Sequence, residues 1–528
     1  MSKSKTGERS RREFMRDVAV TTSTVGVLGA LAGCEGETSD GVADAALSPD
    51  AGLDPDAAAE RDAAPTPDPD AAPPDPDAAP PDPDAAPPAG EPDLQPLRGD
   101  GSHPYHYIDT IVLVQMENRS FDHMMGALAL EEGRTDVDGL RAEMSNPDSE
   151  GGVHAVRPLG ALTALEFDPH HGWNSCHLQW NEGANDGFVR DFETILEAGG
   201  PELVETRRGD IMGYYTRAQL PATYGLADAF TVCNRWHASL LGPTWPNRYY
   251  SHCASSGGLR ANNGLCLEPT PYPALVEAGF SYKCYYTSLF FTLTINSLPQ
   301  KNAVKMDAFF ADCEAGTLPN VSIVEPSFFQ NDDHPPADVR NGQGFIATVY
   351  EALRRSPQWN RMLVLFFYDE HGGFFDHVPP PTVQGDTREA EGFGQLGFRI
   401  PGLIAGPLAR RRFAFDGVVD HASIPKLLAE VFEVPHVNER ARLAGSFEGA
   451  LDVELAKGAN RPPPPTLPPV ILPEASLDTM FKANLQQPEL EDWFRKMGRA
   501  HHSSAPERRR LIRNYLLTAK RLGSIRFV

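Results

Sequence analysis

Oxygen-bearing side chains suited to a metal ion follow two apolar segments of the chain, residues 108–115 and 362–368. They are Glu117 and Asn118 after the first segment, and Asp369 and Glu370 after the second. Carboxylate and amide oxygens are the ligands that hard divalent cations prefer. Acidic residues also end strands as helix caps, but two such groups in one chain favour a metal site over capping. His371 and His377 follow closely and add imidazoles to the second group.

The apolar segments have the length and composition of buried strands, and helical patterns separate them. The predicted strands are 108–115, 321–325, 362–368 and 400–405, and the predicted helices are 345–355 and 423–432. Strands that alternate with helices predict an α/β fold with a mostly parallel central sheet, flanked by helices on both faces. Ligands of such sheets bind at the carboxyl ends of the strands. Both acidic groups are therefore expected at one edge of the sheet.

Five sequence blocks resemble the bacterial phosphoesterase family, which contains secreted phospholipases C and acid phosphatases with an alkaline-phosphatase-like fold. The blocks are VQMENRSFDHMMG, DPHHGWNSCHLQWNEGANDGF, GPTWPNRYY, DHPPADVRNGQ and YDEHGGFFDHVPPP, in this order. The ENRSFDH and YDEHGGFFDHVPPP blocks are the most specific of them. The resemblance implies the same fold that the strand pattern predicts.

The resemblance also implies a role for each matching residue. Glu117 with Asn118, and Asp369 with Glu370, match the two pairs that bind a divalent metal ion, whose identity the sequence leaves open. The remaining matches are Thr244 as the nucleophile, and His171 and His334 as histidines around the transferred phosphoryl group, with His170 an alternative to His171. A Thr hydroxyl can attack phosphorus when a metal ion or a nearby base activates it, giving a phosphothreonine-type intermediate.

Three functions fit this pattern. The first is a metal-dependent phospholipase C that acts on phospholipids. The second is an acid phosphatase of the same superfamily, and the third is a surface-displayed binding lipoprotein on a degenerate enzyme fold. Threonine at position 244 favours the first over the second, since the acid-phosphatase members carry Ser there. The third predicts lost site residues, and each matching position keeps its residue.

The N-terminal hundred residues indicate export and tethering. Residues 1–34 contain Arg11-Arg12 before a short apolar stretch and end in Leu-Ala-Gly-Cys34, which resembles a twin-arginine lipoprotein signal peptide. Residues 35–100 carry 18 acidic and two basic residues and three DPDAAPP repeats, a composition typical of a disordered linker. The phosphoesterase catalytic domain is then expected at 101–528. We expect a lipoprotein anchored through Cys34 in the periplasm or at the cell surface.

The composition excludes some partners and leaves disulfides open. The net charge is −25, so a nucleic-acid-binding surface is not expected. No segment of the sequence has the ~20 apolar residues of a membrane-spanning helix. Six cysteines follow Cys34, and an exported protein can pair them. Cys253 with Cys266 is the expected local pair, because Gly257, Gly258 and Gly264 let the chain between them turn.

Overall fold

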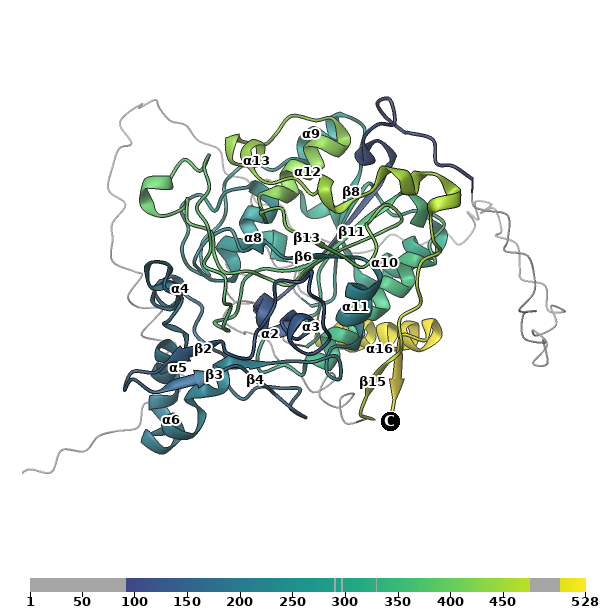
Figure 1. Cartoon of the computed structure of the whole chain (residues 1–528). Coiled ribbons are helices and arrows are strands. Elements are labelled where there is room, and N and C mark those ends of the chain that lie inside the picture. Colours follow the sequence, from purple (N-terminus) through teal and green to yellow (C-terminus); the bar gives the residue numbers. More distant parts are fainter. Residues whose placement is uncertain (1–91, 289–290, 296–297, 329, 475–503) are drawn as a thin grey trace, which may run out of the picture. The chain divides into compact units, whose positions relative to one another are not determined.

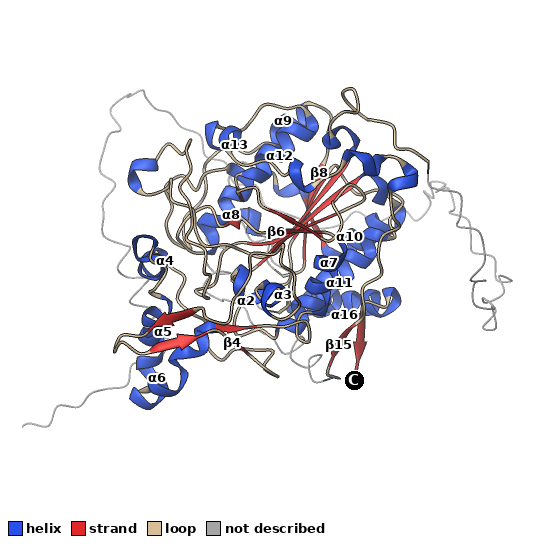
Figure 2. Ribbon diagram, in the orientation of Figure 1, coloured by secondary structure: helices blue, strands red, loops and turns tan. Residues whose placement is uncertain are grey.

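An eight-stranded sheet forms the centre of the fold in the computed structural model (Figures 1 and 2). Its strands, in spatial order, are β13 (Phe413–Phe415), β6 (Thr231–Cys233), β12 (Gly402–Ala405), β11 (Met362–Tyr368), β1 (Thr110–Met116), β10 (Val321–Val324), β8 (Tyr282–Tyr286) and β9 (Ala303–Lys305). Every residue of β1 and β11 is buried. Such uniformly apolar strands require cover on both faces of the sheet.

The predicted α/β class with a mostly parallel sheet is confirmed. Strand β1 pairs in parallel with β10 and with β11, and β10, β8 and β9 continue in the same direction. Strand β12 is antiparallel to both of its neighbours, β11 and β6, and β13 is again parallel to β6. The carboxyl end of β12 therefore lies at the edge opposite to that of the other strands.

Helices cover both faces of the sheet (Figure 1). On one face lie α7 (Pro221–Ala229), α10 (Met306–Ala315), α11 (Val339–Arg354) and α16 (Ala505–Leu522), and on the other lie α8 (Thr244–Cys253), α9 (Tyr272–Glu277), α12 (Ser423–Phe432) and α13 (Glu439–Leu443). Helix α12 has the predicted bounds and buries Ile424, Leu427, Leu428 and Val431, which share one face.

Helix α11 begins six residues before the predicted 345. The Asp338 side chain accepts a hydrogen bond from the Arg340 N–H and caps the first turn. Gly342 lies in that turn, and a Cβ atom there would come within 1.9 Å of Asp333 Oδ1. Close approach to a buried carboxylate thus requires glycine inside this helix, although glycine lowers the helical propensity of the segment.

A smaller group of elements between β1 and α7 stands beside the main sheet (Figure 1). It consists of the short strands β2 (Ser145–Pro147), β3 (Val153–Ala155), β4 (Arg157–Pro158) and β5 (Gly213–Tyr214), with α4 (Trp173–Trp180), α5 (Phe188–Leu196) and α6 (Pro201–Arg207). The short helices α2 (Phe121–Met125) and α3 (Ala127–Leu130) connect β1 to this group. The segment that carries His170 and His171 leads into α4.

Residues 92–100, which the sequence assigns to the end of the linker, contact the folded unit. The Leu94 N–H donates to Ala456 O at 2.8 Å, and the Leu97 N–H donates to His106 O at 2.7 Å. The Arg98 guanidinium lies 5.8 and 5.5 Å from the ring centres of Phe280 and Phe432. A truncation at residue 101 would remove these contacts, so a truncated body should begin at Pro92.

The structure describes residues 92–288, 291–295, 298–328, 330–474 and 504–528. The chain divides into two units, 1–85 and 86–528. Residues 1–91, with the predicted signal peptide, Cys34 and the DPDAAPP repeats, lie outside the described residues. Of the helices that are described, none combines the length and the apolar character needed to cross a bilayer.

Candidate active site

The two acidic groups meet at the carboxyl edge of the central sheet, as the strand pattern predicts. Met116 and Tyr368 are register partners at the ends of β1 and β11. The next residues stay together, because the Asp369 N–H donates to Met116 O at 3.2 Å. The Asn118 N–H in turn donates to Asp369 Oδ1 at 3.0 Å. Residues more than 200 positions apart in sequence thereby share one buried site.

Asn118 takes a backbone conformation that few residues adopt. Its φ is +59°, in the left-handed region that asparagine tolerates better than most side chains. Gly372 packs on this turn, and a Cβ atom there would come within 2.0 Å of Asn118 O. The glycine after the second acidic pair thus permits the close approach of the two loops.

Thr244 lies at the first turn of α8, directed at Asn118. Its Oγ1 donates to Asn118 Oδ1 at 3.3 Å, and the residue is 7% exposed. Asn247 holds the preceding turn, since its Nδ2 donates to Gly242 O at 2.9 Å and its Oδ1 accepts from the Leu240 N–H at 3.1 Å. A hydroxyl at the N-terminal end of a helix faces the partial positive charge that favours a phosphoryl group.

The residues fit a divalent cation. Glu370 is fully buried, and its Oε1 has no hydrogen-bond partner, while its Oε2 accepts the Gly372 N–H at 2.7 Å. Burial raises the pKa of Glu370 to about 8 and that of Glu117 well above its ordinary value. Buried carboxylates of this kind require a positive partner to remain charged. A buried carboxylate oxygen that accepts no hydrogen bond and has His171 Nε2 at 3.8 Å is one that a hard cation would satisfy.

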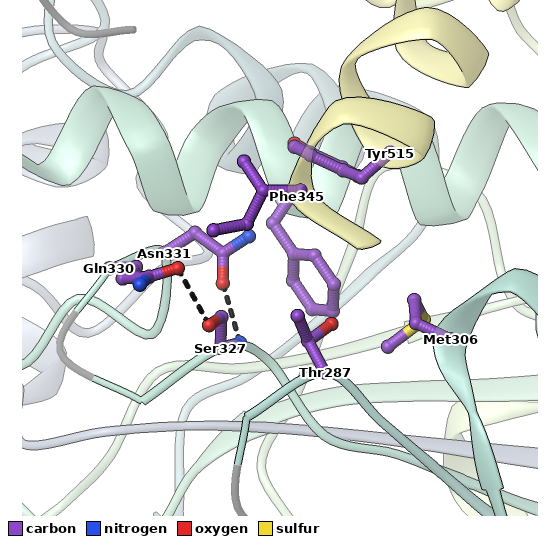
Figure 3. A pocket seen from close by; sticks show the side chains of 8 residues that line it. Thr287, Met306, Ser327, Gln330, Asn331, Phe345 and Tyr515 are labelled. Atoms are coloured by element: carbon purple, nitrogen blue, oxygen red, sulfur yellow. Dashed lines mark hydrogen bonds between the residues drawn. The ribbon is translucent and has the colours of Figure 1, made fainter. Parts of the chain in front are cut away.

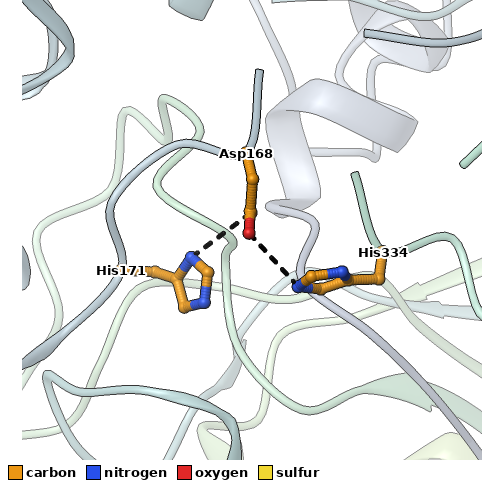
Figure 4. A group of neighbouring side chains, drawn as sticks. All are labelled: Asp168, His171 and His334. Atoms are coloured by element: carbon orange, nitrogen blue, oxygen red, sulfur yellow. Dashed lines mark ion pairs between the residues drawn. The ribbon is translucent and has the colours of Figure 1, made fainter. Parts of the chain in front are cut away.

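His171 and His334 flank this group and share a carboxylate, Asp168 (Figure 4). His171 Nδ1 lies 3.9 Å from Asp168 Oδ1, and His334 Nε2 lies 3.7 Å from Asp168 Oδ2. The donor atoms of the three residues lie within 4.8 Å of one another, close enough to hold a metal ion. His171 Nδ1, however, already donates to Pro169 O at 2.7 Å. Because this hydrogen bond occupies the ring nitrogen nearest Asp168, the group of Glu117, Asn118, Asp369 and Glu370 is the more suitable metal site.

The two histidines differ in charge. Burial opposes protonation of His171, but the carboxylates of Glu370 and Asp168 outweigh it and raise its pKa to about 9. Burial lowers the pKa of His334 to about 4. His171 Nε2 lies 3.1 Å from Asn118 Nδ2, whereas the exposed His170 lies beside Thr194. Of the two adjacent histidines, His171 is therefore the one at the site.

His371 lies beside the predicted metal ligands, whereas His377 does not. His371 Nδ1 lies 3.3 Å from Glu370 Oε2, and its Nε2 lies 2.7 Å from Gln179 Oε1. His377 Nδ1 lies 2.6 Å from Asp122 Oδ2, within a separate cluster around Arg399. The expectation that His377 adds an imidazole to the acidic group is wrong, because the turn after Gly373 carries it to this cluster.

Sequence reasoning missed two residues of the site. Arg248 lies four residues after Thr244 in α8 and contacts both Glu117 and Asp369. Asp168 lies three residues before His171. A helix that begins at Thr244 places Arg248, four residues later, on the same side of the helix, and this spacing was the sequence signal for Arg248.

A cavity beside the ends of β8 and β10 is too small to be the substrate site (Figure 3). Its volume of about 10 Å³ admits roughly one water molecule. It is lined by Thr287, Met306, Ser327, Gln330, Asn331, Phe345, Ile512 and Tyr515. Ser327 Oγ donates to Gln330 Oε1 at 2.8 Å across it. None of the predicted site residues lines this cavity.

The predicted cysteine pair is close in space. Cys253 Sγ and Cys266 Sγ lie 3.6 Å apart, both buried and both free thiols. Cys253 ends α8, and the loop between the two cysteines returns to the start of that helix, where Asn262 Oδ1 accepts the Trp245 N–H at 2.8 Å. A disulfide between them stays a prediction.

Comparison with known proteins places the chain among phosphate-ester hydrolases. Residues 108–435 match the Phosphoesterase family. Non-specific phospholipase C1 of Arabidopsis thaliana is 34% identical over 380 residues, which cover 65% of this chain and 70% of that protein. Phospholipase C A of Mycobacterium tuberculosis is 31% identical over 441 residues, which cover 70% of this chain and 82% of that protein.

Solved structures are more distant. Human ectonucleotide pyrophosphatase/phosphodiesterase 5 has a TM-score of 0.30 at 10% identity, covering 43% of this chain and 94% of its own. The lipoteichoic acid synthase LtaP from Listeria monocytogenes has a TM-score of 0.32 at 8% identity, covering 64% of this chain and 76% of its own. Likenesses this weak carry no argument about the chemistry of the site.

Proposed function

We propose that this chain cleaves phospholipids through a covalent intermediate on Thr244. It belongs to the phosphoesterase family and is a phospholipase C-like phosphoric ester hydrolase. The observation that carries the proposal is the contact between Thr244 Oγ1 and Asn118 Oδ1, 3.3 Å apart at the meeting point of α8, β1 and β11. A nucleophilic hydroxyl, buried carboxylates and two histidines converge there. The names of its relatives in plants and mycobacteria support phospholipids as the substrate class.

A divalent cation would be held by Glu117, Asn118, Asp369 and Glu370. Glu370 and Asn118 each offer an oxygen with a lone pair to spare, since Glu370 Oε1 accepts no hydrogen bond and Asn118 Oδ1 accepts one. Asp369 Oδ1 already accepts the N–H groups of Asn118 and Glu370, and Oδ2 accepts one hydrogen bond from Arg248 Nε, so Oδ2 keeps one lone pair for the cation. When bound, the cation would lower the pKa of a nearby hydroxyl and neutralise negative charge on the phosphoryl group.

The reaction is proposed as two displacements at phosphorus. In the first, Thr244 Oγ1 releases its proton to solvent and bonds to phosphorus while the bond from phosphorus to the glycerol oxygen breaks. Diacylglycerol leaves with a proton from His171, and the head-group phosphate stays on Thr244. In the second, water bonds to phosphorus and the bond to Thr244 breaks. The proton that this water loses to His334 passes to Thr244 Oγ1, which regenerates the hydroxyl, and solvent reprotonates His171.

The histidines divide the proton transfers. His171, whose pKa is raised to about 9, can take up a proton at Nε2 and give it to the departing glycerol oxygen. His334, whose pKa is lowered to about 4, is neutral and can accept a proton from the attacking water. Groups whose environments move their pKa values apart are suited to opposite roles in acid–base catalysis.

The test is an assay of the purified protein on phosphatidylcholine and on p-nitrophenyl phosphate, with and without a chelator. We expect diacylglycerol release from the lipid, abolished by chelation and restored by a divalent metal salt. A monoesterase would instead hydrolyse p-nitrophenyl phosphate alone, and hydrolysis of neither compound would support the non-catalytic binding lipoprotein. Lipid hydrolysis that survives complete metal removal would contradict the metal-dependent mechanism.

Export as a lipoprotein is a separate proposal, on residues outside the described part of the chain. The proposal is twin-arginine export followed by lipidation of Cys34, which would anchor the protein without a spanning helix. Cys34→Ser is expected to move the protein from the membrane fraction to the soluble fraction and to abolish incorporation of labelled fatty acid. Cys253→Ser, at a buried cysteine, is the control and should leave labelling intact. A Cys34→Ser protein that still carries the label would exclude this anchor.

A further inference from the structure

We propose that Arg248 is a built-in second cation of the active site, which limits the site to one divalent metal ion. Its guanidinium occupies the position between Glu117 and Asp369 where a second ion would need to bind. The inference rests on the proposed metal site and concerns how many ions that site holds. Arg248 would act as a positioning residue, because it contacts the predicted ligands Glu117 and Asp369.

Arg248 joins both acidic groups directly. Its Nη2 lies 3.0 Å from Glu117 Oε1, and its Nε donates to Asp369 Oδ2 at 2.9 Å. Nη2 also donates to Met116 O at 3.3 Å, at the end of β1. The residue is 1% exposed. One oxygen of each carboxylate is thereby engaged by a fixed positive charge.

The surroundings hold the guanidinium in place. The ring centres of Phe291 and Phe328 lie 5.4 and 5.2 Å from its central carbon, at distances where aromatic faces attract cations. Glu325, also buried, adds a third carboxylate attraction. Arg248 stands one helical turn after Thr244 and therefore on the same side of α8. The helix that presents the nucleophile also presents the cation.

Hydrogen bonding opposes a second metal ion. Two-metal phosphatase sites hold their ions about 4 Å apart, and a carboxylate that bridges them needs both of its oxygens. Asp369 Oδ1 accepts N–H groups from Asn118 and Glu370, and Oδ2 accepts from Arg248. Glu117 Oε1 is paired with Arg248 as well. Neither carboxylate has two oxygens free to bridge.

Charge balance also favours one divalent ion. The predicted ligands include three carboxylates, those of Glu117, Asp369 and Glu370. One divalent ion together with the Arg248 guanidinium neutralises these three charges. A second divalent ion would leave an uncompensated positive charge in a buried site, which is strongly unfavourable. Removing the guanidinium should therefore create room and charge for a second ion.

A metal titration of the full chain tests the inference. Metal-free protein would be dialysed against Mn²⁺, with bound ions counted by mass spectrometry and paired ions detected by electron paramagnetic resonance. We expect one Mn²⁺ per chain in the wild type. In Arg248→Met we expect a second Mn²⁺ and the spectrum of a spin-coupled pair. Arg248→Lys keeps the charge but cannot bridge both carboxylates, so it should bind one ion about 10- to 100-fold more weakly.

Arg399 supplies a matched control. It is also fully buried, and it bridges two carboxylates, Asp376 Oδ1 at 2.9 Å and Asp122 Oδ1 at 3.0 Å, neither of which is a predicted ligand. Arg399→Lys should lower the melting temperature and leave Mn²⁺ affinity and stoichiometry unchanged. If Arg248 only stabilised the fold, its variants would behave in the same way.

The outcomes separate this inference from the proposed function. Two ions in the wild type, or one ion of unchanged affinity in Arg248→Met, would overturn the inference and leave the metal-dependent hydrolase standing. Should Arg248→Met fail to fold, unchanged affinity in Arg248→Lys decides against the inference. A wild type that binds no Mn²⁺, Zn²⁺ or Ca²⁺ would overturn the metal site and this inference together.

Discussion

Thr244→Ala is expected to reduce turnover by roughly 10⁴-fold or more, because covalent attack by this hydroxyl is the proposed reaction path itself. The fold should survive. The hydroxyl makes one hydrogen bond, to Asn118 Oδ1 at 3.3 Å, and its loss costs on the order of 1 kcal/mol. The measurements are turnover on phosphatidylcholine, melting temperature and metal content. Turnover should collapse while the other two stay close to their wild-type values.

Two further variants sharpen this test. Thr244→Ser keeps the hydroxyl and should retain measurable activity. Thr348→Ala removes a buried hydroxyl of α11 that donates to Gly344 O at 2.7 Å, outside the site, and should leave turnover unchanged. Protein quenched during turnover of phosphatidylcholine should carry the head-group phosphate on the peptide that contains Thr244, whereas a monoester would leave one phosphoryl group there. Near-normal turnover by Thr244→Ala would mean that water attacks phosphorus directly.

Glu370→Gln is expected to remove the bound metal ion and activity together. The change keeps the size of the side chain but removes the charge of the carboxylate whose buried Oε1 accepts no hydrogen bond. Calorimetric metal titrations should show no binding in the range that saturates the wild type. Glu351→Gln, at a buried carboxylate paired with Arg354 at 2.7 Å, is the matched control and should bind metal normally. Retained metal affinity in Glu370→Gln would exclude Glu370 as a ligand.

Metal binding should also release protons. Burial raises the pKa of Glu370, so this carboxyl keeps its proton to a higher pH than a free carboxyl and must be ionised to bind a cation. Metal affinity of the wild type should therefore rise with pH up to about 8 and then level off, and Glu117, whose pKa is also raised, adds to the same trend. Titrations in buffers of different ionisation enthalpy would count these protons.

The strongest sequence signals predicted the fold elements that the structure shows. The run 362–368 is strand β11 and 423–432 is helix α12, each with the predicted bounds. Strands β8 and β6 were not predicted, because β8 carries Lys283 among aromatic residues and β6 has three residues. The antiparallel direction of β12 was not predicted either, since a strand's composition does not encode the path of the chain that leads into it.

Some residues of the site could be predicted from the sequence and others could not. The two acidic groups could be predicted to meet because parallel strands end at one edge. Thr244 lies in a Gly/Pro-rich turn, a common place for threonine, and only the family resemblance singled it out. Asp168 was not predicted, because its importance lies in the contact with His334, which is distant in sequence. Arg248 was missed although its spacing from Thr244 places it on the same side of α8. The sequence places the end of the linker at residue 100 on composition alone. Composition could not show that residues 92–100 already contact the folded unit.

The position of β1 in the sheet has a consequence for how the protein is made. This strand emerges first from the ribosome, yet its two partners, β10 and β11, follow about 210 and about 250 residues later. At ~5–20 residues per second, roughly 12 to 50 s of synthesis separate β1 from β11. Throughout that time seven residues that are wholly buried in the fold lack both neighbours. A pathway that exports folded proteins would let this pairing finish before the chain crosses a membrane, so that this buried strand is never carried across unpaired.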